Sequence, residues 1–228
     1  MFENTAKYRK GSHGDGAFSM ADVMKSEAVQ NIAATSALKS TINGVRSGIC
    51  MAYVLEWIRN KTLDAERIQH APNRMDNFRS LRVAVDVMIY QEKLEQVFDE
   101  CGADLKVFLE RAEVRAPQPI EVPYGPLPFN DCALLVGFTL TTHTPYFMSY
   151  EWGDAAHAIA LYRTMNKYTI FDPNCGELSC QNASIEIMWA DYEKDLKVLR
   201  PGKGLPHTFN LASVGVVPVR PRWNQGVV

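Results

Sequence analysis

Cys50 has the sequence surroundings of a reactive thiol. It follows Ser47-Gly48-Ile49, and the residues after it predict a helix over 50–60, because apolar side chains recur at i, i+3, i+4 and i+7: Met51, Val54, Leu55 and Ile58. Cys50 would lie in the first helical turn, where unpaired N–H groups and roughly half a positive charge stabilise a thiolate. A helix N-terminus and a neighbouring imidazolium can lower a cysteine pKa from about 8.5 to about 3.5–7.5. Cys50 is therefore a candidate nucleophile.

Two residues further along the chain are candidate partners for this thiol. His157 lies near the start of one apolar stretch, and Asp172 closes the next one. If the two stretches pair as a hairpin, their opposite ends come into register and the two side chains lie close together. A nucleophilic cysteine needs an imidazole to hold the thiolate and transfer protons, and a carboxylate to orient the imidazole. The three residues predict a Cys-His-Asp triad.

Each of the three residues also has a purely structural interpretation. Free cysteine is among the most buried residue types, so Cys50 would be a small core residue. His157 would be a hydrogen-bonded structural histidine, and Asp172 would cap a turn, because Asp172-Pro173-Asn174 favours turns. These residues alone leave both interpretations open.

Proline divides the chain into two halves that must position these side chains. Only Pro72 lies before residue 116, and eleven prolines lie after it. Because proline interrupts helix interiors and central strands, we expect long helices first and short elements afterwards. The expected helices cover residues 21–40, 50–60, 80–111 with an interruption near Gly102, and 184–198. The expected strands cover 133–141, 146–150, 157–163, 168–171 and 212–219, after an extended linker over 117–128. This order predicts an α+β domain.

The composition argues against several classes of protein. The 228 residues carry 24 basic and 26 acidic side chains, so the basic excess typical of a nucleic-acid-binding protein is absent. The longest apolar run covers about residues 132–138, far short of the roughly 20 residues of a membrane-spanning helix. No secretory signal peptide is recognisable in the N-terminal residues. Five cysteines, an odd number, fit free thiols in a reducing compartment.

Neither a metal nor a cofactor is expected. Cys175 and Cys180 form a C-x4-C pair, but no second pair or histidine follows at the spacing of a zinc site. The sequence also lacks a phosphate-binding loop, an H-E-x-x-H motif and an EF-hand loop. The predicted chemistry therefore depends on protein side chains alone.

Three short blocks surround the candidate triad in chain order. Gly48-Ile49-Cys50 precedes a helix that contains Trp57-Ile58, and the other two blocks are His157-Ala158-Ile159-Ala160-Leu161 and Phe171-Asp172-Pro173-Asn174-Cys175-Gly176. Together they resemble the YopT/AvrPphB-type cysteine proteases, a family of bacterial effectors, over about Ser47 to Glu177. The resemblance implies a papain-like cysteine protease fold, with a helical N-terminal half packed against an antiparallel sheet from the C-terminal half. Residues 36–228 would form the catalytic domain, and residues 1–35 a flexible, pro- or targeting segment.

The resemblance also implies the roles of the site residues. Cys50 would be the nucleophile, His157 the general base and acid, and Asp172 the orienting carboxylate. The backbone N–H of Cys50 would be one donor of the oxyanion hole. Asn43 is the nearest side-chain amide upstream, although Gly44 lies closer to the usual papain-like spacing. Asn43-Gly44 is equally typical of a turn.

The expected partner follows from the resemblance as well. The substrate would be a host protein, either a small GTPase or a protein kinase, and the balanced charge of the chain does not distinguish between them. The protein would be secreted by a bacterium without a classical signal peptide and would act in the host cytoplasm as a monomer. No nucleic-acid partner and no integral membrane segment are expected.

Two other functions are compatible with the same residues. A glutamine deamidase or transglutaminase would use the same triad and thioester but would release ammonia from a side chain. A non-enzymatic binding domain would keep Cys50 as a core residue, and its thiol would not react at mildly acidic pH.

Overall fold

The fold is α+β: among the described elements, all helices but α9 lie in the first half of the chain, and one antiparallel sheet and α9 lie in the second. The computed structural model describes residues 20–35, 49–66, 80–101, 104–115, 124–128, 140–152, 155–181, 185–199, 202, 204–206 and 208–221. The helices are α1 (Met20–Lys25), α2 (Glu27–Thr35), α4 (Cys50–Glu66), α6 (Leu81–Cys101), α7 (Leu105–Arg111) and α9 (Ile185–Leu199). The strands are β1 (Tyr124–Pro128), β2 (Pro145–Trp152), β3 (Ala155–Arg163), β4 (Lys167–Asp172), β5 (Gly176–Gln181) and β6 (Thr208–Ser213).

The six described strands form one sheet in the order β1-β6-β2-β3-β4-β5. Strands β2 to β5 are successive antiparallel neighbours and form a meander, in which β2, β3 and β4 correspond to the strands expected over 146–150, 157–163 and 168–171. Strand β6 then returns and pairs between β1 and β2. The chain therefore brings the ends of β3 and β4 together at a central position of the sheet.

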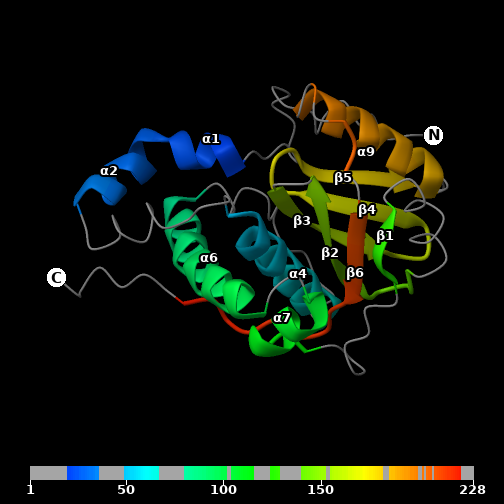
Figure 1. Ribbon diagram of the computed structural model, residues 1–228, viewed down its shortest axis with the longest axis horizontal. Helices are drawn as coiled ribbons and strands as arrows, with labels where there is room; N and C mark the ends of the chain where they lie inside the picture. Colours follow the sequence, from blue (N-terminus) through cyan, green and yellow to red (C-terminus); the bar gives the residue numbers. More distant parts are fainter. Residues whose placement is uncertain are drawn as a thin grey trace.

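Helices cover both faces of this sheet. In Figure 1, α4, α6 and α7 lie on one side of the strands and α9 lies on the other. Each strand contributes side chains to the hydrophobic layers on both faces of the sheet, because successive side chains of a strand point to opposite faces. In β3, for example, Ala158 and Ala160 pack with α4 and α6, whereas Ile159 and Leu161 pack with α9. Two hydrophobic layers thus hold α4 and α9 against opposite faces of the strands that carry His157 and Asp172.

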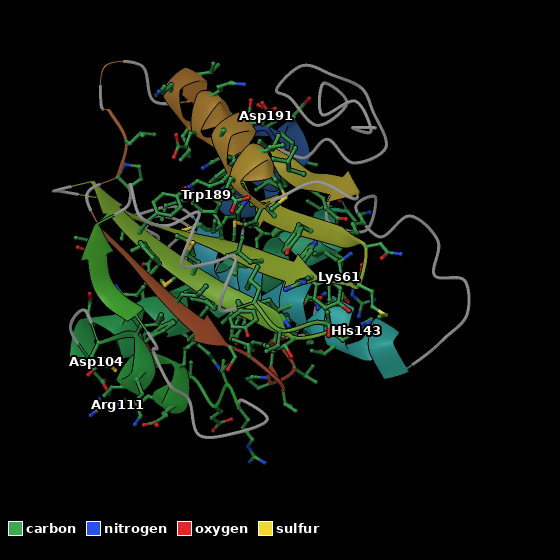
Figure 2. The ribbon with its side chains drawn as sticks, turned by 90° about the vertical axis from the view of Figure 1, so that its right-hand side faces the viewer. Lys61, Asp104, Arg111, His143, Trp189 and Asp191 are labelled. Carbon is green, nitrogen blue, oxygen red and sulfur yellow. The ribbon has the colours of Figure 1, made fainter. Side chains whose placement is uncertain are left out.

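Helix α4 is the central helix of the first layer. It contacts β2, β3, β4 and α6, and most of its side chains from Cys50 to Ile58 are buried. Trp57 fixes it against the meander, because its ring stacks on Phe171 with 5.5 Å between centroids and its Nε1 donates to Glu177 Oε2 at 3.1 Å. Lys61, one turn further along α4, lies 3.3 Å from the same carboxylate oxygen (Figure 2). These contacts set the position of α4 relative to β4 and β5.

The predicted interruption of the helix expected over 80–111 is confirmed. Helix α6 ends at Cys101, and α7 begins at Leu105 after Asp104 accepts a hydrogen bond from the backbone N–H of Val107 at 3.1 Å. An aspartate at this position satisfies one of the N–H groups that a helix start leaves unpaired. The predicted helix over 184–198 is also present, as α9.

Three expectations about extended segments need correction. Residues 124–128 belong to a strand and not to a linker: β1 pairs with β6, and its register shifts between Tyr124 and Leu127. The strand tolerates its prolines because it lies at the edge of the sheet and carries this irregularity. The last strand covers 208–213 and not 212–219. The sequence interpretation also missed β5. The strand expected over 133–141 falls mostly outside the described residues.

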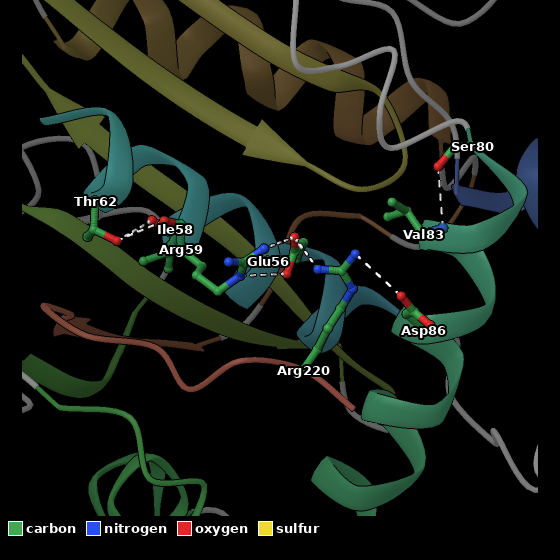
Figure 3. A network of polar contacts seen from close by, with 8 residues as sticks. All are labelled: Glu56, Ile58, Arg59, Thr62, Ser80, Val83, Asp86 and Arg220. Carbon is green, nitrogen blue, oxygen red and sulfur yellow. Dashed lines mark hydrogen bonds and ion pairs between the residues drawn. The ribbon is translucent and has the colours of Figure 1, made fainter. Parts of the chain in front are cut away.

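After β6, the C-terminal segment leaves the sheet and runs along the helical layer (Figure 1). Val216 exchanges two backbone hydrogen bonds of 2.7 Å with Arg115, which follows α7. Further on, Arg220 Nη1 donates to Glu56 Oε1 of α4 at 2.7 Å, and its Nη2 lies 3.6 Å from Asp86 Oδ2 of α6 (Figure 3). Arg59 also binds Glu56, through Nε at 3.0 Å and Nη2 at 2.6 Å. Arg220 therefore links the end of the described chain to two helices.

Helices α1 and α2 lie within the segment 1–35, for which we expected flexibility or a targeting role. Val29 of α2 is buried against the helical layer, and the N–H of Met20 donates to the carbonyl of Pro173 at 2.7 Å. Residues 1–19 lie outside the described residues. The division of the chain at residue 35 remains a prediction.

Candidate active site

Cys50 is the first residue of α4. The first turn is closed by a hydrogen bond of 3.2 Å from the N–H of Tyr53 to the carbonyl of Ile49. The neighbouring N–H of Ala52 donates to Oε1 of Gln91, which reaches across from α6, at 3.0 Å. Gln91 is fully buried. Two elements therefore fix the turn that carries the thiol.

We expect Gln91→Met to lower the free energy of unfolding by about 1–2 kcal/mol, because the buried N–H of Ala52 loses its acceptor while the volume of the side chain is kept. Urea denaturation followed by circular dichroism measures the loss. Gln30→Met is the control, because Gln30 is exposed and its side chain donates to the nearby carbonyl of Met24 at 2.8 Å. A loss no larger than that of Gln30→Met would contradict the capping role of Gln91.

His157 and Asp172 meet through the hairpin that joins β3 and β4. The ladder pairs Ala160 with Phe171, so the start of β3 and the end of β4 lie at the same end of the hairpin. His157 Nε2 lies 2.9 Å from Asp172 Oδ1, and both side chains are almost completely buried, 4% and 1% exposed. The structure thus places together the two residues that the sequence predicts as partners.

Asp172 is held from three directions. Besides His157, its Oδ1 accepts a hydrogen bond of 2.7 Å from the backbone N–H of Asn174, which makes the turn expected from Asp172-Pro173-Asn174. Its Oδ2 accepts a hydrogen bond of 2.7 Å from the hydroxyl of Tyr192 in α9. Asp172 therefore caps the turn and binds His157 at the same time.

The electrostatics of the site favour three charged groups. Burial by itself would raise the pKa of Asp172, but the charge and hydrogen bond of His157, with the hydrogen bonds from Asn174 and Tyr192, hold it below its usual value. Burial would lower the pKa of His157, but Asp172 and Cys50 together raise it to about 10. Burial would raise the pKa of Cys50, but a hydrogen bond from the His157 side chain, the charge of that imidazole and the N–H of Ala158 lower it. The contacts of the site therefore stabilise the charged form of each group: the thiolate of Cys50, the imidazolium of His157 and the carboxylate of Asp172.

The nitrogen assignment of His157 follows from these contacts. Because Nε2 faces Asp172, Nδ1 is the ring nitrogen left to contact the sulfur of Cys50. Asn174 Nδ2 lies 3.2 Å from the same Nε2. In the protonated ring, Nε2 carries a hydrogen that it donates to Asp172, so it cannot accept a hydrogen bond from the side-chain amide of Asn174. The protonated ring therefore requires that the amide oxygen of Asn174, and not its nitrogen, faces Nε2.

Asn43, the predicted side-chain donor of the oxyanion hole, lies outside the described residues. No local sequence pattern marks Gln91 or Tyr192, which contact the site from α6 and α9. Asn174 belongs to the block Phe171-Asp172-Pro173-Asn174-Cys175-Gly176, where the sequence predicts a triad aspartate and a turn but not the contact of the Asn174 side chain with His157.

Within the described residues, no group of three or more histidine, cysteine, aspartate or glutamate side chains is arranged to hold a metal ion. None of the described helices is long and apolar enough to cross a membrane.

Two comparisons with known proteins each give a match. Residues 142–200 match the peptidase family C58 model, described as the Yersinia/Haemophilus virulence surface antigen. This interval contains His157 and Asp172. The fold is similar to that in the crystal structure of the Pseudomonas avirulence protein AvrPphB, with a TM-score of 0.52 and 16% sequence identity, over 74% of this chain and 92% of that chain. A search of curated proteins gives no match.

The resemblance to the YopT/AvrPphB-type effector proteases, which the three sequence blocks predict, is confirmed by these two comparisons. The α+β architecture is confirmed as well, because the likeness to AvrPphB extends over most of both chains.

Proposed function

We propose that this protein is a cysteine endopeptidase of the papain-like type, in which Cys50, His157 and Asp172 form the catalytic triad. One observation carries the proposal: a cysteine at a helix N-terminus is hydrogen bonded to a buried histidine whose other nitrogen lies 2.9 Å from a buried carboxylate. A cysteine that was only a core residue would need neither partner, and burial alone would leave its pKa raised.

The reaction follows from the positions of these groups. The Cys50 thiolate attacks the carbonyl carbon of the substrate peptide, forming a C–S bond and an oxyanion. The backbone N–H of Cys50 would donate to this oxyanion, with Asn43 as the proposed second donor. The C–N bond then breaks as Nδ1 of the His157 imidazolium gives its proton to the leaving amine. Water attacks the thioester, the neutral imidazole accepts its proton, and the C–S bond breaks to restore the thiolate–imidazolium pair.

By the same resemblance, the protein would be a bacterial effector that is secreted without a classical signal peptide and cleaves a host protein in the host cytoplasm. The proposed substrates are a small GTPase or a protein kinase. The proposed catalytic domain comprises residues 36–228 and acts as a monomer.

The proposal is tested by comparing new protein N-termini in a host-cell lysate treated with the wild type or with Cys50→Ala. We expect a small set of new N-termini that appear only with the wild type. Cys101→Ala is the matched control, because Cys101 is a half-buried thiol at the end of α6, and it should give the wild-type set.

Two results would contradict the proposal. If no new N-terminus depends on Cys50, the chain does not cleave proteins in that lysate by this thiol. If proteins keep their backbones intact and instead gain about one dalton in a Cys50-dependent way, the same thioester chemistry deamidates glutamine, and the deamidase alternative replaces the protease.

A further inference from the structure

Tyr192 and Tyr150 form a buried hydroxyl chain that ends on the carboxylate of Asp172. The hydroxyl of Tyr192, in α9, donates to Asp172 Oδ2 at 2.7 Å, and the hydroxyl of Tyr150, in β2, lies 2.7 Å from that of Tyr192. Both tyrosines are 0% exposed. This chain of hydroxyl groups reaches Asp172 from the face of the sheet opposite to the face that α4 covers.

The direction of the hydrogen bonds follows from the charge of Asp172. An ionised carboxylate only accepts hydrogen bonds, so the Tyr192 hydroxyl must donate its proton to Oδ2. Because that proton is used, the oxygen of Tyr192 can only accept from Tyr150. Tyr150 therefore donates to Tyr192, and Tyr192 donates to Asp172. Because both hydrogen bonds point toward the carboxylate, each polarises and strengthens the other.

We propose that Tyr192 is a positioning residue of the active site, which holds Asp172 ionised and turned so that its Oδ1 faces His157. This inference rests on the proposed triad. Asp172 Oδ1 accepts hydrogen bonds from the backbone N–H of Asn174 and from Nε2 of His157. The hydrogen bond from Tyr192 to Oδ2 fixes the other oxygen, and therefore the rotation of the carboxylate.

The packing of α9 does not require the hydroxyl of Tyr192. Helix α9 buries Ile185, Met188, Trp189 and Leu196 in the same hydrophobic layer as the ring of Tyr192. Figure 2 shows Trp189 on the side of α9 that faces the sheet. A phenylalanine at position 192 would fill the same space, so the hydroxyl has a separate role that Tyr192→Phe isolates.

The loss of this hydroxyl should be visible in the pH dependence of the site. Without the donor at Oδ2 the buried carboxylate is less stabilised, so the pKa of Asp172 rises. As the pH falls, Asp172 then takes up a proton earlier and stops stabilising the imidazolium of His157. The titratable groups that face Asp172 come from every element around it: Cys50 of α4, Tyr150 of β2, His157 of β3, Cys175 before β5 and Tyr192 of α9.

The test measures the rate of alkylation of Cys50 by iodoacetamide across the pH range, with the labelled peptide quantified by mass spectrometry. This readout requires no substrate. For Tyr192→Phe we expect the acid limb of the profile to move upward by about one pH unit, which is the size of one hydrogen bond to a charged group. Tyr150→Phe should move it in the same direction by less.

Tyr146→Phe is the matched control. Tyr146 is a buried tyrosine of the same strand as Tyr150, and its hydroxyl bonds to Thr141 at 3.1 Å. Its loss should leave the profile unchanged. In the Asp172→Asn background, Tyr192→Phe should cause no further shift, because the group through which it acts no longer titrates.

The outcomes separate this inference from the proposed function. An unshifted profile in a folded Tyr192→Phe, or a shift that persists in the Asp172→Asn background, would overturn the role of Tyr192. If Tyr192→Phe does not fold, an unshifted profile in Tyr150→Phe overturns it. If wild-type Cys50 instead shows an ordinary thiol profile that His157→Asn does not change, the triad itself fails.

Discussion

Replacing His157 by asparagine is expected to reduce kcat/KM for the cleaved host protein by at least about a thousandfold, because triad members act as a unit and the loss of one removes most of the catalysis. Asparagine fits the buried position but cannot carry the charge that stabilises the thiolate or transfer a proton to the leaving amine. Initial rates of cleavage at neutral pH, measured on the protein identified in the lysate, give the ratio.

His143 provides the control for this substitution. It is an exposed histidine in the turn before β2, its ring contacts Tyr162, and its backbone N–H donates to the carbonyl of Arg163 at 2.7 Å. Its backbone has a positive φ of 63°, a conformation that asparagine tolerates, so His143→Asn should keep both the fold and the activity. Comparable rates for the two variants would show that His157 is a structural histidine.

Replacing Arg220 by methionine is expected to cost about 3 kcal/mol of unfolding free energy, because it removes one partner of a buried ion network and leaves the charges of the others. The side chains of Glu56 and Asp86 are only 5% and 1% exposed, and Arg220 itself is 12% exposed. Glu56 keeps Arg59, which limits the loss on that side. Urea denaturation at neutral pH measures the change.

The matched comparison is Arg111→Met. Arg111 pairs with Glu100 at 3.1 Å, but these side chains are largely exposed, so the substitution should change stability by less than about 1 kcal/mol. Arg220→Lys should fall between the two, because lysine keeps the charge but cannot reach both carboxylates with a planar fork. Equal losses for Arg220→Met and Arg111→Met would contradict a buried network.

The candidate triad was predictable because its members lie at recognisable points of the local pattern. Cys50 precedes an amphipathic helix, and His157 and Asp172 lie at opposite ends of two strands of one hairpin. The residues that support the triad give no such signal. Tyr192 and Gln91 occupy ordinary positions on helices, and only the packing of α9 and α6 brings them to the site.

The fold was predictable to a similar extent. Helices α4, α6, α7 and α9 and strands β2 to β4 follow from periodicity and turn residues, which are local properties. Strand β1 was missed because its prolines are typical of a linker, and only its position at the edge of the sheet makes them acceptable. The course of the chain after Ser213 depends on Arg115 and on the ion pairs of Arg220, which are distant in sequence.

The pKa of Cys50 in the wild-type protein is the most direct test of the central claim, that this thiol is a thiolate held by His157 and Asp172. Its alkylation rate by iodoacetamide is measured from acidic to alkaline pH, with buried Cys175 as an internal reference whose thiol pKa burial and nearby carboxylates raise. We predict that Cys50 stays reactive well below the ordinary thiol pKa of about 8.5 while Cys175 does not react, and that His157→Asn abolishes the difference. A Cys50 profile with an ordinary or raised midpoint, unchanged in His157→Asn, would contradict the account.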